Sequence, residues 1–188
     1  MKPQLGDTIL NRYTLVSSLR EEPGIQAWKA NDRVLAKDCQ LFIITDRSAF
    51  AAIDKLAGRI AATRPDRVIP ILKYRMESDV LLIVMPVDSG QCLTDYMVDT
   101  AKPLSYSAIR SIIGECADVL REVIADTPSG IVITTDTVRV TTSGVQIADA
   151  PCATMLADTS ATDLRTDGPE RYAVSYTHLR AHETRGNL

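Results

Sequence analysis

The sequence predicts an α+β fold, in which a small antiparallel sheet with one helix precedes a mainly helical part. In residues 1–87, short apolar and β-branched runs are separated by turn residues, and one helical pattern follows the third run. After residue 88 the longest apolar pattern has helical spacing. The chain has 188 residues, of which 45% are apolar, so it can bury one core or two small lobes. We therefore expect two domains, 1–87 and 88–173.

Three strands are expected before the first helix, and turn residues bound each of them. They cover residues 12–19, 25–31 and 39–45. Pro23 and Gly24 break the first pair, and Asp32 and Arg33 break the second.

A helix is expected over residues 47–63, because its apolar residues recur at helical spacing and Asp46 can cap its first turn. The expected stripe consists of Phe50, Ile53, Ala57, Ile60 and Ala61. Two further strands, 69–76 and 80–86, bring the expected sheet to five strands. The second of these is apolar throughout and is expected to be central.

The second part begins with a turn at 88–91 and continues with a short helix over 92–98. The clearest helix covers 105–125, with Ser105 or Ser107 as its cap. Its apolar stripe is Ile109, Ile112, Ile113, Cys116, Leu120 and Ile124. A hairpin is expected from strands 138–141 and 145–148, joined through Ser143 and Gly144.

Two motifs in the first part resemble those of a known family. The run Ala27-Trp28-Lys29-Ala30-Asn31-Asp32 is similar to V-Y-x-A-x-D, and residues 39–44 fall where bacterial serine/threonine kinases have V-A-L-K and two apolar residues. Over roughly residues 5–170 the chain resembles actinobacterial-type serine/threonine protein kinases. The resemblance implies a two-lobe fold, with a five-stranded N-lobe sheet plus helix and a partial helical C-lobe.

The chain departs from this family where kinases hold the phosphates of ATP. Phe42 stands where a lysine contacts the α- and β-phosphates, and counting back from Arg64-Pro65 places Lys55 where its glutamate partner belongs. The loop between the first two strands has only Gly24, preceded by two glutamates and a proline, and reads as an ordinary hairpin turn. Lys29 shares the strand parity of Ala27 and is the one candidate for a substitute lysine.

The catalytic motifs also differ from those of the kinase family. Gly130-Ile131-Val132 is followed directly by Ile133, without the H-R-D segment, and Thr137 stands where the magnesium-binding asparagine belongs. Asp149 keeps the aspartate of D-F-G, but Ala150 and Pro151 replace the other two residues. The chain has no histidine before residue 178, so histidine-based catalysis is excluded up to that point.

The first hypothesis is a degenerate pseudokinase, truncated in the C-lobe, that acts as a regulatory or protein-binding scaffold. The resemblance implies an active kinase and a phosphothreonine-binding domain as partners. Phosphate would be added to threonines of the activation segment, where this chain has Thr154, Thr159, Thr162 and Thr166. Two alternatives remain open: a phospho- or nucleotidyltransferase using Lys29, Asp136 and Asp149, and an adenine-nucleotide sensor using the hinge Met85-Pro86-Val87.

The resemblance also gives the expected lining of a degenerate nucleotide cleft, which is Ala27, Lys29, Met85, Val87 and Asp149. We expect no catalytic residue, no metal ligand and no cofactor, because the phosphate-binding and catalytic motifs of the family are replaced; ATP and Mg²⁺ have only the support of the alternatives.

Composition and charge limit the partners and the cellular location that we expect. The net charge of −3 and the scattered basic residues argue against nucleic-acid binding. Four separated cysteines without a CxxC pair are typical of reduced thiols, and neither a signal peptide nor a membrane span is expected, so we predict a cytoplasmic protein. Residues 174–188 lack a periodic apolar face and resemble translated adaptor sequence, so we expect a non-native tail.

Overall fold

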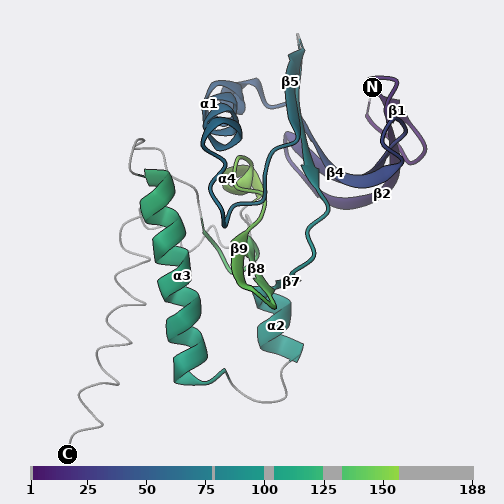
Figure 1. Ribbon diagram of the computed structural model, residues 1–188. Coiled ribbons are helices and arrows are strands. Elements are labelled where there is room, and N and C mark those ends of the chain that lie inside the picture. The colour runs from purple at the N-terminus through teal and green to yellow at the C-terminus, as the bar shows by residue number, and fades with distance from the viewer. Residues whose placement is uncertain (1, 78, 100–103, 125–132, 157–188) are drawn as a thin grey trace, which may run out of the picture. The chain divides into compact units, whose positions relative to one another are not determined.

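The computed structural model describes residues 2–77, 79–99, 104–124 and 133–156. Its larger sheet has six antiparallel strands in the order β1-β2-β3-β4-β6-β5, and Figure 1 shows that these strands curl strongly. The strands are β1 (Thr8–Ile9), β2 (Tyr13–Glu22), β3 (Ile25–Asp32), β4 (Lys37–Ile44), β5 (Lys73–Glu77) and β6 (Val80–Pro86). All five expected strands are present, and β1 is an additional two-residue strand.

An additional strand and the later start of β5 are two differences from the prediction that have identifiable reasons. β1 forms because Leu10 and Asn11 both adopt a positive φ, which reverses the chain and returns it along β2. β5 begins at Lys73 instead of residue 69, because Val68 and Ile69 pair with Ile147. The amide of Ile69 donates to the carbonyl of Ile147 at 2.9 Å, which ties the two sheets of the chain together.

Each face of the larger sheet carries its own apolar cluster, because side chains alternate along a strand. On β4, Phe42 and Ile44 belong to what we call the inner core, whereas Cys39, Leu41 and Ile43 belong to the opposite face. The inner core contains Ile25, Ala27, Phe42, Ile44, Phe50, Ile53, Ala57, Ile69, Leu81, Ile83, Met85, Ala148 and Cys152.

Helix α1 (Arg47–Thr63) covers the inner core with the predicted stripe. Phe50, Ile53, Ala57 and Ile60 are buried, while Ala61 is half-buried. The carboxylate of Asp46 accepts from the amide of Ser48 at 2.9 Å, which confirms the predicted N-cap. The helix ends at Arg64, whose positive φ is the usual way to leave a helix.

The described residues after Pro86 form a three-stranded sheet and three helices. The sheet has the order β7-β8-β9, formed by β7 (Gln91–Cys92), β8 (Val138–Thr141) and β9 (Gly144–Ile147). The helices are α2 (Leu93–Asp99), α3 (Tyr106–Ile124) and α4 (Ala153–Leu156). Ser105 caps α3, as predicted, by accepting from the amide of Ala108 at 3.2 Å. Within the described residues, the structure contains no helix with the length and apolarity that a bilayer span requires.

The stripe of α3 is less buried than its spacing predicts. Ile113 is 48% exposed, and Val119, which the predicted stripe omits, is fully buried against β8 and β9. The exposed part of the stripe borders an open apolar groove of about 460 Å³, lined by Leu93, Met97, Leu104, Ile109, Ile112 and Ile113.

Candidate functional site

A small cleft of about 240 Å³ lies where the cleft residues were predicted. Its walls come from β2, β3 and β4, from the hinge after β6, from the turn before β8, and from the residues after β9. The lining residues are Leu19, Arg20, Ala27, Lys29, Gln40, Val87, Asp88, Asp136, Arg139 and Asp149. This volume is below the range that is usual for ligand pockets.

Four of the five residues predicted for the cleft line it together. Ala27 and Lys29 come from β3, Val87 follows β6, and Asp149 follows β9. The fifth, Met85, is fully buried in the inner core, although it pairs across the strands with Gln40, which does line the cleft.

Phe42 occupies the β4 position at which the resemblance implies a lysine. Its side chain is fully buried in the inner core, opposite Ala27 on β3 and Ile83 on β6. The same cluster includes Ala148 and Cys152, which flank Asp149. An aromatic ring in this position adds apolar contacts and provides no cation for a phosphate group.

The lysines nearest in sequence do not replace the missing one. Lys37 begins β4, opposite Asp32 and five residues before Phe42, and it is exposed. Lys29 does line the cleft, but its ammonium lies 2.8 Å from the carboxylate of Asp38, and its side chain is 40% exposed.

The residue counted as the position of the helix glutamate lies on the outside of α1. Lys55 lies on the exposed side of α1, so the count back from Arg64 does not identify a residue that faces β4. The residues that α1 buries against the sheet are all apolar. The one acidic residue of α1, Asp54, is half-buried and does not belong to this buried set.

The turn between β2 and β3 has the geometry of the predicted hairpin. Gly24 has φ +79°, and a Cβ atom there would lie 2.6 Å from Cβ of Asp46, so a larger residue would not fit. The carbonyl of Gly24 accepts from the amide of Thr45 at 2.8 Å and from that of Asp46 at 3.2 Å. The turn is thus fixed to the start of α1.

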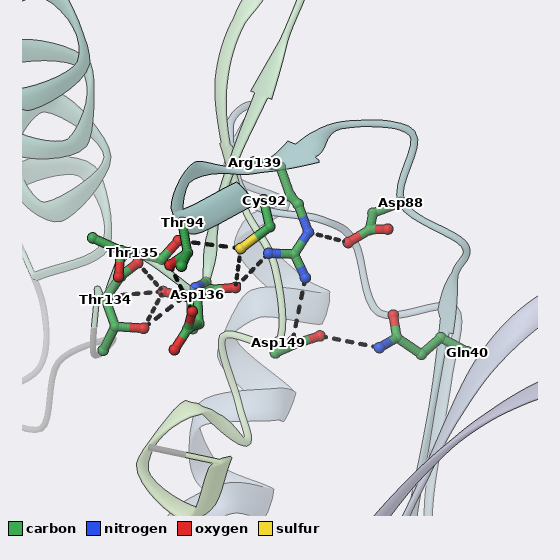
Figure 2. Close-up of polar contacts among 10 residues, drawn as sticks. Gln40, Asp88, Cys92, Thr94, Thr134, Thr135, Asp136, Arg139 and Asp149 are labelled. Atoms are coloured by element: carbon green, nitrogen blue, oxygen red, sulfur yellow. Dashed lines mark hydrogen bonds and ion pairs between the residues drawn. The ribbon is translucent and has the colours of Figure 1, made fainter. Parts of the chain in front are cut away.

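The turn before β8 uses its polar groups internally. Thr137, at the position of the expected asparagine, is buried, and its hydroxyl donates to the carbonyl of Thr134 at 3.1 Å and accepts from the amide of Thr134 at 2.8 Å. The carboxylate of Asp136 accepts from the hydroxyl of Thr94 at 2.7 Å (Figure 2). This is the side-chain bonding that threonine and aspartate commonly make in turns.

Asp149 is an acid of the cleft whose pKa is shifted by its surroundings. Its side chain is only 12% exposed, and its backbone has a positive φ of 55°. The amide of Gln40 donates to one carboxylate oxygen at 3.3 Å, and the guanidinium of Arg139 lies 3.8 Å from the other. Burial, which the charge of Arg139 only partly offsets, raises the pKa of Asp149 to about 6.

Arg139 joins the acids of the cleft, as Figure 2 shows. Its Nε donates to the carboxylate of Asp88 at 2.5 Å, and its Nη1 donates to the backbone carbonyl of Asp136. Sequence reasoning did not identify Arg139, Asp88 or Gln40 as site residues. Gln40 offered a signal, because it is the one polar residue among the apolar residues 39–44 of β4.

The charges that line the cleft balance one another. Its three cations are Arg20, Lys29 and Arg139, and its three acids are Asp88, Asp136 and Asp149. Each of these six groups has a partner within the protein, including Arg20, whose Nε lies 3.3 Å from the carboxylate of Glu22.

The cleft does not fit ATP with Mg²⁺ as the family motifs would bind it. The phosphate-binding lysine is replaced by buried Phe42, the asparagine position is part of a closed turn, and Asp149 is bonded to Gln40 and Arg139. Across the described residues, no three His, Cys, Asp or Glu side chains lie close enough to hold a metal ion.

Comparisons with known proteins identify the fold to which this site belongs. No protein-family model matches the sequence, and no curated protein matches it either. Among solved structures, the chain is similar to a cysteine-to-alanine variant of the Mycobacterium tuberculosis PknI kinase domain, with a TM-score of 0.63 and 16% identity over 80% of this chain and 63% of that one. It is also similar to the apo form of PpkA-294, with a TM-score of 0.66 and 11% identity over 88% of this chain and 66% of that one.

The chain therefore has a protein kinase-like α+β fold, with an N-lobe and a partial C-lobe. It spans less than two thirds of the length of each of the two structures.

Proposed function

We propose that this chain is a catalytically impaired protein kinase-like domain that acts as a regulatory, protein-binding scaffold in signalling. The observation that carries the proposal is the burial of Phe42, which fills with apolar contacts the position at which phosphoryl transfer needs a cation. A lysine placed there would lie in the inner core, where the side chains that α1 buries are all apolar.

Two other features of the cleft support the same conclusion. The hydroxyl of Thr137 is used within its own turn, and Asp149 is bonded to Gln40. Three elements of the phosphoryl-transfer machinery are thus used for packing or for internal hydrogen bonds, in three separate parts of the chain.

A thermal-shift assay with millimolar ATP and Mg²⁺ tests the proposal, because a ligand that binds the folded state raises the melting temperature. We expect no shift, and no transfer of label from γ-labelled ATP to the chain or to a general acceptor protein. An active serine/threonine kinase provides the positive control for both measurements. A saturable shift that requires Mg²⁺ would contradict the proposal.

The alternative transferase has one observation in its favour, which is that Lys29, Asp136 and Asp149 all line the same cleft. If label is transferred, Lys29→Ala should abolish the transfer. Lys37→Ala is the matched control, because Lys37 is an exposed lysine that begins the neighbouring strand. A thermal shift without transfer would instead favour the adenine-nucleotide sensor, with Val87 as the hinge residue that lines the cleft.

The partners that we propose are an active kinase and a phosphothreonine-binding domain. A phosphate on an activation-segment threonine would offer a dianion to arginines of such a domain. The side chain of Thr154 and the whole of Thr159, Thr162 and Thr166 lie outside the described residues. Phosphopeptide mapping after incubation with an active kinase tests this proposal, and phosphate on none of the four threonines would exclude it.

A further inference from the structure

The guanidinium of Arg139 lies where three segments of the chain meet (Figure 2). It bonds the carboxylate of Asp88 in the hinge and the backbone carbonyl of Asp136 in the turn before β8, and it lies 3.8 Å from Asp149 after β9. Only 14% of its side chain is exposed. The planar fork of an arginine can serve several acceptors in fixed directions, which a lysine ammonium cannot do equally well.

Asp149 extends this set of contacts into the larger sheet. Its second carboxylate oxygen accepts from the amide of Gln40, which lies on β4 and is itself buried. A continuous path of polar contacts therefore runs from β4 through Asp149 and Arg139 to Asp88 in the hinge. This path connects the six-stranded sheet with β8 of the three-stranded sheet.

Gly90 allows the hinge to come close enough for these contacts. A Cβ atom at this position would lie 2.6 Å from Cβ of Arg139 and 3.2 Å from the carbonyl oxygen of Val140. The second of these neighbours is backbone and cannot move aside easily. The hinge therefore lies against β8 only because residue 90 has no side chain.

We infer that Arg139 is an internal latch, whose guanidinium fills the polar end of the cleft and holds the hinge, the turn before β8 and the end of β9 together without nucleotide or metal. The latch rests on the proposed function and deepens it. A domain that does not bind ATP needs another way to order its cleft, and the contacts of Arg139 provide one. The latch contacts the carboxylates of Asp88 and Asp149, two of the three acids that a cationic ligand could use in this cleft.

The test is chemical rescue of the Arg139→Ala variant. Amide hydrogen exchange in residues 88–92 and 134–141 is the measurement. We expect roughly tenfold faster exchange in both segments of the variant, because local opening no longer breaks the contacts of the guanidinium. Ethylguanidinium at millimolar concentration should slow that exchange again, whereas ethylammonium should not, because only the first ion reproduces the fork. Arg75→Ala is the matched control, because Arg75 forms an exposed pair with Glu77 far from the cleft.

Unchanged exchange in both segments of Arg139→Ala, or equal rescue by the two ions, would overturn the latch. If Arg139→Ala does not fold, Arg139→Lys and Asp88→Asn replace it, and both should exchange faster than the wild type in the same two segments. Wild-type exchange in both variants would overturn the latch as well. No nucleotide is used, so a failed rescue rejects the latch alone, and a thermal shift with ATP rejects the proposed function alone.

Discussion

Asp32 and Asp149 both face an arginine, yet the pKa of the first is lowered and that of the second is raised. Asp32 ends β3 and accepts from Nε and Nη2 of Arg12 at 2.8 and 2.6 Å, and also from the amides of Val34 and Leu35. The hydrogen bonds from Arg12, more than any other contact, lower the pKa of Asp32 to about 2.

Asp149 meets its arginine at 3.8 Å only and accepts one hydrogen bond, from the side chain of Gln40. Burial therefore dominates and raises the pKa of Asp149 to about 6. The comparison teaches that an arginine lowers the pKa of a neighbouring aspartate when it donates two short hydrogen bonds to that carboxylate, and not when it only lies near it. The Arg12–Asp32 pair stabilises the end of the sheet, whereas the cleft keeps a carboxylate that is poorly satisfied.

The largest expected effect comes from removing the well-bonded acid. Asp32→Ala should lower the free energy of unfolding by about 3 kcal/mol, because Arg12 loses its partner and two turn amides lose their acceptor. Urea denaturation at neutral pH measures the change. Glu77→Ala, which removes an exposed ion pair with Arg75, is the control and should change stability little. Equal losses in the two variants would mean that the Arg12–Asp32 pair has no special role.

A smaller effect is expected from the pH dependence of stability at Asp149, which has the opposite direction to that at Asp32. Its folded-state pKa lies above the unfolded value, so the folded state binds the proton more tightly and stability decreases as pH rises through about 4 to 6. Relative to Asp149→Asn, the wild type should therefore gain about 1 kcal/mol when the pH falls from about 7 to about 5. Asp32 contributes nothing in this window, because its stabilisation is lost only between about pH 4 and pH 2.

Denaturation curves of the wild type and Asp149→Asn at the two pH values measure the difference. A wild type that loses stability on acidification, relative to Asp149→Asn, would show that Arg139 stabilises the carboxylate as strongly as Arg12 stabilises Asp32.

Much of the fold follows from local sequence patterns. The five long strands, α1 with its Asp46 cap, α3 with its Ser105 cap and the β8–β9 hairpin all combine a clear periodicity with a recognisable end signal. The prediction failed where long-range pairing decides the structure. Ile69 was predicted to begin a strand of the larger sheet, but its amide bonds Ile147, which lies far away in the sequence and also pairs with Val68.

Residues of the site could be predicted from the sequence only where they belong to a family motif. Ala27, Lys29, Val87 and Asp149 lie together as the family motifs imply, and Phe42 was recognised because its position is defined by a strand. Lys55 was placed by a count along a helix, where each residue turns the direction of the side chain by about 100°, and the structure leaves it exposed. Arg139 and Asp88 belong to no motif, and only the fold brings them to Asp149.

The most direct test of the central claim, that Asp149 serves the protein's own cleft and not a metal, is a ¹³C carboxyl NMR titration with and without millimolar Mg²⁺ and ATP. We predict a pKa of about 6 for Asp149 and about 2 for Asp32, unchanged by the additions. A pKa of Asp149 that falls toward that of Asp32 when Mg²⁺ and ATP are added would contradict the account, because it would identify Asp149 as a working metal ligand.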